Sequence, residues 1–347
     1  MDAPFISVII PVYNTAAYLP ACLDSLLNQT FTDWEAICVN DGSKDDSLAI
    51  LQQYAAKDTR FRIINQDNTG VSAARNHGLA AASGVYVTMV DSDDVLPPMA
   101  LSHLAEPGRQ AFAPDLVIGG MRWVKTAAPT EHSVTKVLTY DAKQEGLFNN
   151  RAFAVGHISG LPSGKLYKRS LIETFSLRYN RDLKVGEDHE FLIRFIMRAC
   201  SFYAVEEPVY DYIMRENSTM GKYDQGKEKY QVYEDFSLSK ARLIPKLLQF
   251  DWRREEQRDF AESLLFFYWR DWVRSSFALI RRPLALLHLS LRIYRGLSFF
   301  APLLSHRDCI ALYRNNRYLP YTSPYTFLLH LYPRLWKNKL KRLLSHA

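Results

Sequence analysis

Three aspartates, Asp91, Asp93 and Asp94, stand within four positions, directly after the apolar run VYVTMV. Carboxylates this close destabilise a fold unless a cation compensates their charge. Oxygen ligands favour a divalent cation, and a site with few carboxylates favours Mg²⁺ or Mn²⁺, which also bind water and phosphates. A metal on a diphosphate would neutralise a leaving group. The alternative, a loop that caps a helix beginning near Pro97 or Pro98, explains only one of the three aspartates.

A second acidic pair, Glu187 and Asp188, stands in the segment KVGEDHEF. Acids in the first turn of a helix interact favourably with its dipole, and most acidic helix starts have only this role. A hydroxyl that attacks an activated donor, however, needs a base, and this pair is the next candidate along the chain. His189 is interpreted as a residue of the helix surface, and the role of His157 is left open.

Polar residues follow each of the first four expected strands, as PVYN, NDGS, NQDNTG and DSDD. Because ligands of an open parallel sheet bind beyond the carboxyl ends of its strands, these groups are expected at one rim. Asp41 fits either a turn or an acceptor for a base or ribose. Tyr13 is either a rim aromatic or a stacking surface for a nucleobase. Arg75 either pairs with a surface acid or clamps a phosphate.

The elements expected around these residues alternate along the first hundred positions. Strands are expected at 5–12, 34–40, 60–65 and 85–90, and helices at 16–30, 45–57 and 72–82. This alternation predicts an α/β fold, with a parallel sheet covered by helices on both faces. Later expectations are strands at 115–123 and 133–141, the second of which could be antiparallel, and helices at about 101–108 and 187–200.

The chain changes character near Tyr223, where long helical stretches begin, so we expect two domains, 1–223 and 224–347. From Trp272 onward 13 Lys and Arg face a single acid, Asp308, a net charge of +12, whereas the whole chain carries +6. An acidic front and a basic tail usually have different roles. The segment 325–347 mixes Leu, Trp and Tyr with Lys and Arg, which is typical of an amphipathic helix on an anionic membrane surface.

Other interpretations of the basic tail rank lower. A helical cap on the first domain with a solvated basic face comes second, and nucleic acid a distant third, because no nucleic-acid-binding motif accompanies the charge. Arg292 and Arg295 interrupt the apolar stretch at 283–304, so no spanning helix is expected. The four cysteines lie far apart, which suits a reducing compartment, and the N-terminus does not resemble a signal peptide.

Taken together, these segments resemble a family 2 inverting glycosyltransferase with the nucleotide-diphospho-sugar transferase (GT-A) fold. The matching segments occur in order between about residues 5 and 220, as SVIIPVYN, VNDGSKDDS, NTGVSAARNHGL, VDSDD, GKLYKRSL and GEDHEF. The set is highly specific, although each piece alone is not. The resemblance implies a GT-A, Rossmann-like, mostly parallel sheet with helices on both faces, followed by a C-terminal helical region.

The resemblance also implies a nucleotide site. Pro11, Val12 and Tyr13 would line the nucleoside pocket. Asp41 would bind the uracil edge, and Arg75 would help to hold the nucleotide.

Metal and catalytic roles are implied in the same way. Asp93 would bind Mn²⁺ or Mg²⁺ directly, and Asp91 would complete the D-x-D motif near the ribose. Asp94 would only cap the helix that follows. Asp188 would deprotonate the acceptor hydroxyl, with support from Glu187.

Two further substrate contacts are expected, Lys165 in GKLYKRSL and Arg215 in the segment 211–220. That segment resembles a flexible loop that closes over the diphosphate, where Ser218 is a second candidate contact.

The expected activity is therefore transfer of a sugar from a UDP-sugar to a hydroxyl of a glycan or lipid-linked glycan, in polysaccharide or lipopolysaccharide biosynthesis. We expect it in the cytoplasm, peripheral to the inner face of the cell membrane. A nucleotidyltransferase would need a phosphate loop rich in Gly and Lys, which PVYNTAAYLP lacks. A non-catalytic sugar-nucleotide-binding or scaffold protein is the remaining alternative. It would tolerate loss of Asp188, whereas the full carboxylate set is present.

Overall fold

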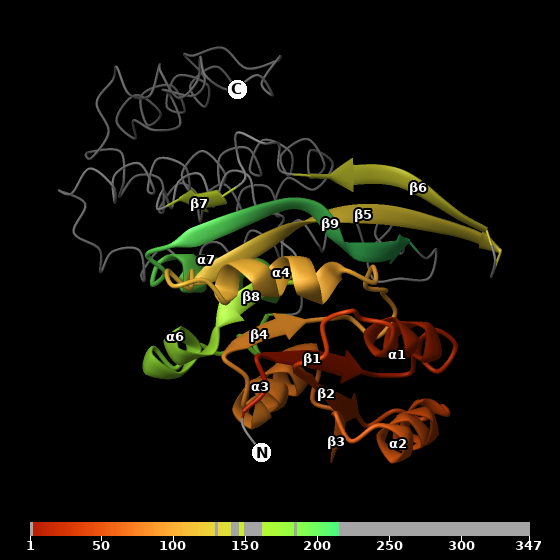
Figure 1. Ribbon diagram of the computed structural model, residues 1–347. Coiled ribbons are helices and arrows are strands. Elements are labelled where there is room, and N and C mark those ends of the chain that lie inside the picture. Colours follow the sequence, from red (N-terminus) through yellow and green to blue (C-terminus); the bar gives the residue numbers. More distant parts are fainter. Residues whose placement is uncertain (1–2, 129–130, 140–145, 149–161, 184–185, 215–347) are drawn as a thin grey trace, which may run out of the picture. The chain divides into compact units, whose positions relative to one another are not determined.

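The first four strands form a parallel sheet, as the sequence predicts (Figure 1). In the order β3-β2-β1-β4 lie β3 (Phe61–Gln66), β2 (Trp34–Asp41), β1 (Ile6–Val12) and β4 (Tyr86–Met89). Each neighbouring pair is parallel. Every residue of β1 and β2 is buried, as is typical of parallel strands that are covered on both faces.

The computed structural model describes residues 3–128, 131–139, 146–148, 162–183 and 186–214. All of them belong to one compact unit, Met1–Asn150 with Ile158–Gln225. The predicted boundary near Tyr223 and the helical stretches from residue 224 onward lie outside these residues. Within the described part, no helix has the length and apolar character that crossing a membrane requires.

Helices pack on both faces of the parallel strands because side chains alternate along a strand. α1 (Leu19–Leu27) and α4 (Ala100–Gly108) contribute to the hydrophobic core that contains Val8 and Ile10 of β1. α3 (Val71–Ala81) packs on the opposite face, where Gly78 lies against Ile9. α2 (Ser47–Lys57) packs beside α1 and against β3.

α4 spans Ala100–Gly108, which confirms the helix expected at about 101–108, and Pro97 and Pro98 precede it. The carbonyls of both prolines accept hydrogen bonds from Gln29 and Thr30, which follow α1. The Gln29 side chain donates to the Pro97 carbonyl over 2.8 Å, and the Thr30 backbone N–H donates to that of Pro98 over 3.0 Å. These contacts fix the two prolines in the connection that precedes α4.

The second part of the sheet is mixed. β8 (Lys165–Lys168) lies antiparallel between β4 and β5 (Leu116–Ala128), and β9 (Phe202–Met214) runs parallel to β5. β6 (Glu131–Leu138) and β7 (Gly146–Phe148) pair antiparallel with β5 and β9. Two helices, α6 (Arg169–Thr174) and α7 (Glu187–Ile196), complete the described elements. The α/β prediction is confirmed, but the sheet is mixed and not mostly parallel: the parallel pairs are those among the first four strands and the pair β5–β9, and the other pairs are antiparallel.

β9 corrects one prediction made from the sequence. The segment 211–220 was expected to be a flexible loop, but its first four residues end β9, paired with β5. Residues 215–220 lie outside the described part of the chain. The backbone of Asp211 also forms a bridge with Val95 at the end of the metal-candidate loop. The expected loop is therefore a strand at least as far as Met214.

Candidate active site

The loops that follow β1, β2 and β4 are tied together at one edge of the sheet. The Asn14 backbone N–H donates to Ser43 Oγ over 3.1 Å, and the Lys44 N–H donates to Asn14 Oδ1 over 2.8 Å. Thr15 Oγ1 donates to Ser92 Oγ over 3.0 Å. Parallel strands bring their carboxyl ends to one edge, so polar residues from distant parts of the sequence meet there.

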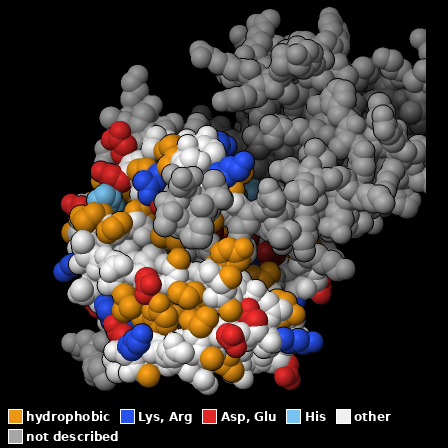
Figure 2. Space-filling model, turned by 90° about the vertical axis from the view of Figure 1, so that its right-hand side faces the viewer, with side chains coloured by type: hydrophobic (Ala, Val, Ile, Leu, Met, Phe, Trp, Pro, Cys, Tyr) orange, Lys and Arg blue, Asp and Glu red, His pale blue; other side chains and the backbone are white. Residues whose placement is uncertain are grey.

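The nucleoside-pocket candidates differ in exposure. Pro11 and Val12 are the last residues of β1, and both are buried, with Val12 in the hydrophobic core. Tyr13, the next residue, is 45% exposed. Apolar and acidic side chains lie next to one another on the side of the molecule toward which β1 and β4 run (Figure 2). Tyr13 is thus the candidate whose ring can reach a ligand from this rim.

Asp41 organises the loop that leads into α3. Its Oδ1 accepts hydrogen bonds from Gln66 Nε2 over 2.7 Å and from the Thr69 N–H over 2.8 Å. Its Oδ2 accepts one from the Gly70 N–H over 2.9 Å. Asp41 is only 3% exposed, so its carboxylate is both occupied by these three donors and shielded from solvent. Asp41 is thus a buried anchor of this loop, and its contact with a base stays a prediction.

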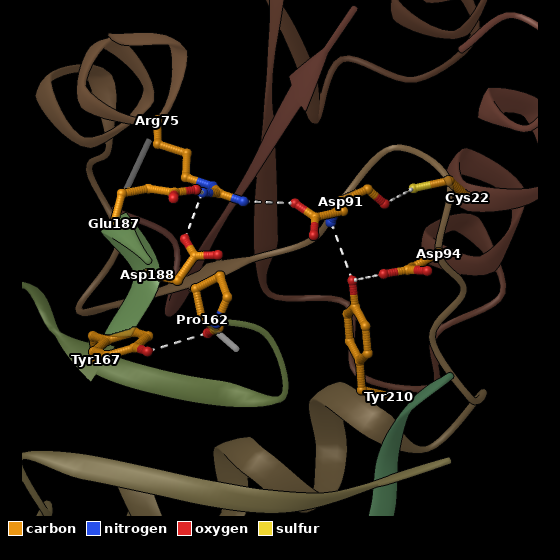
Figure 3. Close-up of polar contacts among 9 residues, drawn as sticks. All are labelled: Cys22, Arg75, Asp91, Asp94, Pro162, Tyr167, Glu187, Asp188 and Tyr210. Carbon is orange, nitrogen blue, oxygen red and sulfur yellow. Dashed lines mark hydrogen bonds and ion pairs between the residues drawn. The ribbon is translucent and has the colours of Figure 1, made fainter. Parts of the chain in front are cut away.

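Arg75 joins the two acidic segments that the sequence singled out (Figure 3). Its Nη1 lies 2.5 Å from Asp188 Oδ1 and 3.1 Å from Glu187 Oε1, and its Nη2 lies 3.0 Å from Asp91 Oδ1. The arginine side chain is only 4% exposed. Its guanidinium also lies over the ring of Tyr179, 5.3 Å from the ring centre. Arg75 is therefore a buried bridge between the end of β4 and the start of α7, and not a surface cation.

The start of α7 presents its acids to Arg75. Gly186 has a φ of +81°, a conformation that glycine adopts without strain, and the helix begins at the next residue. Glu187 and Asp188 lie in the first turn, where the helix dipole favours negative charge. Burial raises the pKa of Asp188 well above its ordinary value, although the charge of Arg75 opposes the shift. His189 is 8% exposed, so its interpretation as a surface residue was wrong.

Asp94 does not cap α4, which corrects its predicted role. The N-cap position of that helix is Met99, and it makes no side-chain capping bond. Asp94 is 1% exposed, and it accepts hydrogen bonds from Tyr210 Oη over 2.6 Å and from the Ile213 N–H over 2.8 Å. Burial, followed by the charge of Asp91, raises the pKa of Asp94 to about 8. The third aspartate is thus engaged by β9.

The remaining two aspartates provide a limited set of metal ligands. The side chain of Asp91 is 29% exposed, and Asp93 is half-buried. Within the described residues, no group of three or more His, Cys, Asp or Glu could hold a metal ion. Two carboxylates with no nitrogen or sulfur ligand fit a Mg²⁺ or Mn²⁺ ion that takes its other ligands from water and from a bound phosphate.

Lys165 lies beneath the site. Its side chain is buried, and Nζ donates to the Ser163 carbonyl over 3.2 Å. Burial lowers the pKa of Lys165 to about 7, a shift that Asp188 opposes. Because Lys165 is buried, a substrate would have to reach the interior of the protein to contact it, and the predicted contact stays a prediction. Arg215, Ser218 and His157 lie outside the described residues.

Sequence reasoning missed two tyrosines of this site. Tyr210 contacts Asp94 and the backbone of Asp91, and Tyr179 lies under Arg75 and stacks on Phe191 with ring centres 4.2 Å apart. The available signal for Tyr210 was the run of aromatic and β-branched residues at 202–214, which is typical of a strand. No local pattern marks Tyr179.

Comparison with known proteins identifies the family. The family model for glycosyl transferase family 2 matches residues 7–175. Glycosyltransferase GlyG of Streptococcus pneumoniae is 30% identical over 229 residues, which cover 62% of this chain and 72% of that protein. This chain belongs to glycosyl transferase family 2.

Another relative agrees with this membership, and a solved structure shows the fold. The family 2 chain is 33% identical over 229 residues to the putative glycosyltransferase EpsH of Bacillus subtilis, and the match covers 65% of each protein. It therefore spans less than two thirds of that relative. Staphylococcus aureus TarS 1–349, solved in complex with UDP-GlcNAc, superposes with a TM-score of 0.67 at 23% identity, over 88% of this chain and 83% of TarS. This likeness shows a common GT-A fold.

Proposed function

We propose that this protein is an inverting glycosyltransferase that moves a sugar from a UDP-sugar to a hydroxyl of a glycan or lipid-linked glycan. The observation that carries the proposal is the bridge that Arg75 forms between Asp91 and the pair Glu187–Asp188. It joins the candidate metal loop to the candidate base at the carboxyl edge of the sheet. UDP as the donor nucleotide is supported by the exposed ring of Tyr13 and by the UDP-GlcNAc complex of TarS.

Asp188 is the proposed general base. Its raised pKa makes its carboxylate a better proton acceptor than an exposed aspartate. In the proposed step, Asp188 takes the proton of the acceptor hydroxyl while the hydroxyl oxygen forms a bond to the anomeric carbon. The bond from that carbon to the diphosphate breaks, and UDP leaves with the bonding electrons. One displacement inverts the anomeric carbon, and no enzyme nucleophile is needed.

Arg75 and Glu187 position the base in this proposal. The bond from Arg75 fixes the Asp188 side chain at one oxygen, and the charge of Arg75 opposes the rise of the Asp188 pKa that burial causes. Asp93 and Asp91 would hold Mn²⁺ or Mg²⁺, which supplies positive charge to the departing diphosphate when it is bound.

Asp188→Asn tests the assignment of the base. The variant should retain UDP binding and lose sugar transfer by about 10²–10⁴-fold, because asparagine cannot accept the proton. UDP affinity is measured by calorimetry, and transfer by UDP release in the presence of an acceptor. Asp33→Asn is the matched control, an exposed aspartate at the amino end of β2, and it should behave like the wild type. Full transfer activity in Asp188→Asn would refute the assignment.

The same assay separates the alternative function. If the protein is a non-catalytic sugar-nucleotide-binding protein, the wild type and Asp188→Asn should both bind UDP. Neither should release UDP from any donor in a panel of UDP-sugars. The proposed enzyme releases UDP from at least one donor, and the wild type alone decides between the two.

A further inference from the structure

A buried hydroxyl group on β9 contacts the candidate metal loop at two residues (Figure 3). Tyr210 Oη donates to Asp94 Oδ2 over 2.6 Å and accepts a hydrogen bond from the backbone N–H of Asp91 over 3.2 Å. Tyr210 is fully buried and Asp94 is 1% exposed. The Tyr210 hydroxyl group therefore contacts both ends of the loop. It binds the backbone of Asp91 at the start and the side chain of Asp94 at the end.

Three further contacts fix β9 against the same loop. The Ile213 N–H donates to Asp94 Oδ1 over 2.8 Å. Val95 and Asp211 exchange both backbone hydrogen bonds, over 3.2 and 2.9 Å. The Asp211 carboxylate is in turn held by Arg122 of β5, with two contacts of 2.5 and 2.6 Å. The loop is thus held against β9, which is itself paired with β5.

These contacts assign different roles to the three aspartates. Both oxygens of Asp94 are engaged by β9, and the residue is shielded from solvent. A metal ligand at this rim would need an accessible oxygen, which Asp94 does not offer. Asp91 and Asp93 remain at the partly exposed side of the loop. Loss of the Tyr210 hydroxyl would leave a buried amide and a buried carboxyl oxygen without this partner, so the loop would have to shift.

We infer that Tyr210 is a positioning residue for the metal site, that it sets the loop so that Asp91 and Asp93 can bind one divalent ion together, and that Asp94 is its buried anchor and not a third ligand. The inference rests on the proposed function, because it assumes that these two aspartates bind the metal.

The test is a titration of the full chain with Mn²⁺ in the presence of saturating UDP, with the free ion counted by electron paramagnetic resonance. Tyr210→Phe should bind Mn²⁺ about tenfold more weakly than the wild type, the lower end of the effect expected for a residue that orients ligands. Its affinity for UDP in EDTA should be unchanged. Unaltered Mn²⁺ affinity in Tyr210→Phe would overturn the inference.

Tyr86→Phe is the matched control. Tyr86 is also fully buried, and its hydroxyl donates to the Pro114 carbonyl over 2.8 Å, at the opposite end of β4 from the metal loop. Both variants should lose thermal stability, but only Tyr210→Phe should lose Mn²⁺ affinity. Equal losses of Mn²⁺ affinity in the two variants would show a general effect of stability and would contradict the inference.

A second pair of variants, at Asp94 and Asp93, tests which of the two aspartates is a metal ligand. This test does not require Tyr210→Phe to fold. Asp94→Asn retains an oxygen that can accept from the Ile213 N–H and presents its amide N–H to Tyr210 Oη, which can accept it, so this variant should keep most of the Mn²⁺ affinity, whereas Asp93→Asn should lose it. Loss of binding in Asp94→Asn to the same extent as in Asp93→Asn would make Asp94 a ligand and refute the inference. If the wild type binds no Mn²⁺ with UDP, the metal site of the proposed function fails first, and the inference with it.

Discussion

Arg75 carries one positive charge among three carboxylates, those of Asp91, Glu187 and Asp188. The cluster therefore has an excess of negative charge before any ligand binds. A divalent ion beside Asp91 would offset that excess, and the diphosphate of a donor would add negative charge that the ion compensates. Buried arginine suits such a bridge because its guanidinium stays charged and offers several donors in a fixed geometry.

Lys165 gives a prediction about stability and pH. Burial lowers its pKa from 10.5 to about 7 in the folded protein, so between these values the unfolded chain binds more protons than the folded one. The free energy of unfolding should therefore rise with pH across this window, by up to about 1.4 kcal/mol per pH unit from this residue. Below about pH 7 the folded protein carries the full penalty of a buried charge.

The comparison of the wild type with Lys165→Met isolates this contribution. Urea midpoints of both proteins are measured at pH 7 and pH 9. The wild type should gain stability relative to the variant on going to pH 9. Parallel behaviour of the two proteins at both pH values would show that the lysine is not buried as described.

At the scale of elements, α3 places Arg75 because it approaches β1 closely. A Cβ added at Gly78 would lie 2.4 Å from Ile9 Cγ2, which is too short for any real contact. The helix start is fixed independently, since Asp41 binds the backbone of Thr69 and Gly70 just before the helix. β1 and the end of β2 thus set the position from which Arg75 reaches both acidic segments.

Gly78→Ala should destabilise the protein by roughly 1–3 kcal/mol through overpacking against Ile9. Helix propensity alone would predict the opposite sign, a stabilisation of about 1 kcal/mol. Thermal unfolding measures the difference. In the background Ile9→Ala, which removes the facing atoms, the penalty of Gly78→Ala should largely disappear. An unchanged penalty in that background would contradict the close approach of α3 and β1.

At the scale of the whole molecule, the charge of the chain is divided between residues 1–271 and a basic tail that begins at Trp272. The segment from Trp272 onward has a net charge of +12. Because the whole chain has +6, the preceding residues have a net charge of −6. We propose that the tail binds an anionic membrane surface, where a lipid-linked acceptor would be found. A helical cap with a solvated basic face is the alternative.

Liposome flotation distinguishes these two roles of the tail. The full chain should float with vesicles that contain anionic lipid and remain in solution with neutral ones. A chain truncated after residue 324 should lose this binding, because it lacks the five Lys and Arg of the last amphipathic segment. Equal flotation of the truncated chain would exclude this segment as the membrane contact.

The sequence by itself determined the parallel strands, the polar residues at their ends, and the two acidic segments. These features depend on local periodicity and on residue types, which a single sequence displays directly. Only the tertiary structure decided that Arg75 bridges Asp91 and Asp188, which are separated from it by 16 and 113 positions. It also decided that Tyr210 anchors Asp94 across 116 positions and that Lys165 is buried. Such contacts depend on strand order, and β8 and β9 take their places in the sheet through pairings between distant segments that no local pattern specifies.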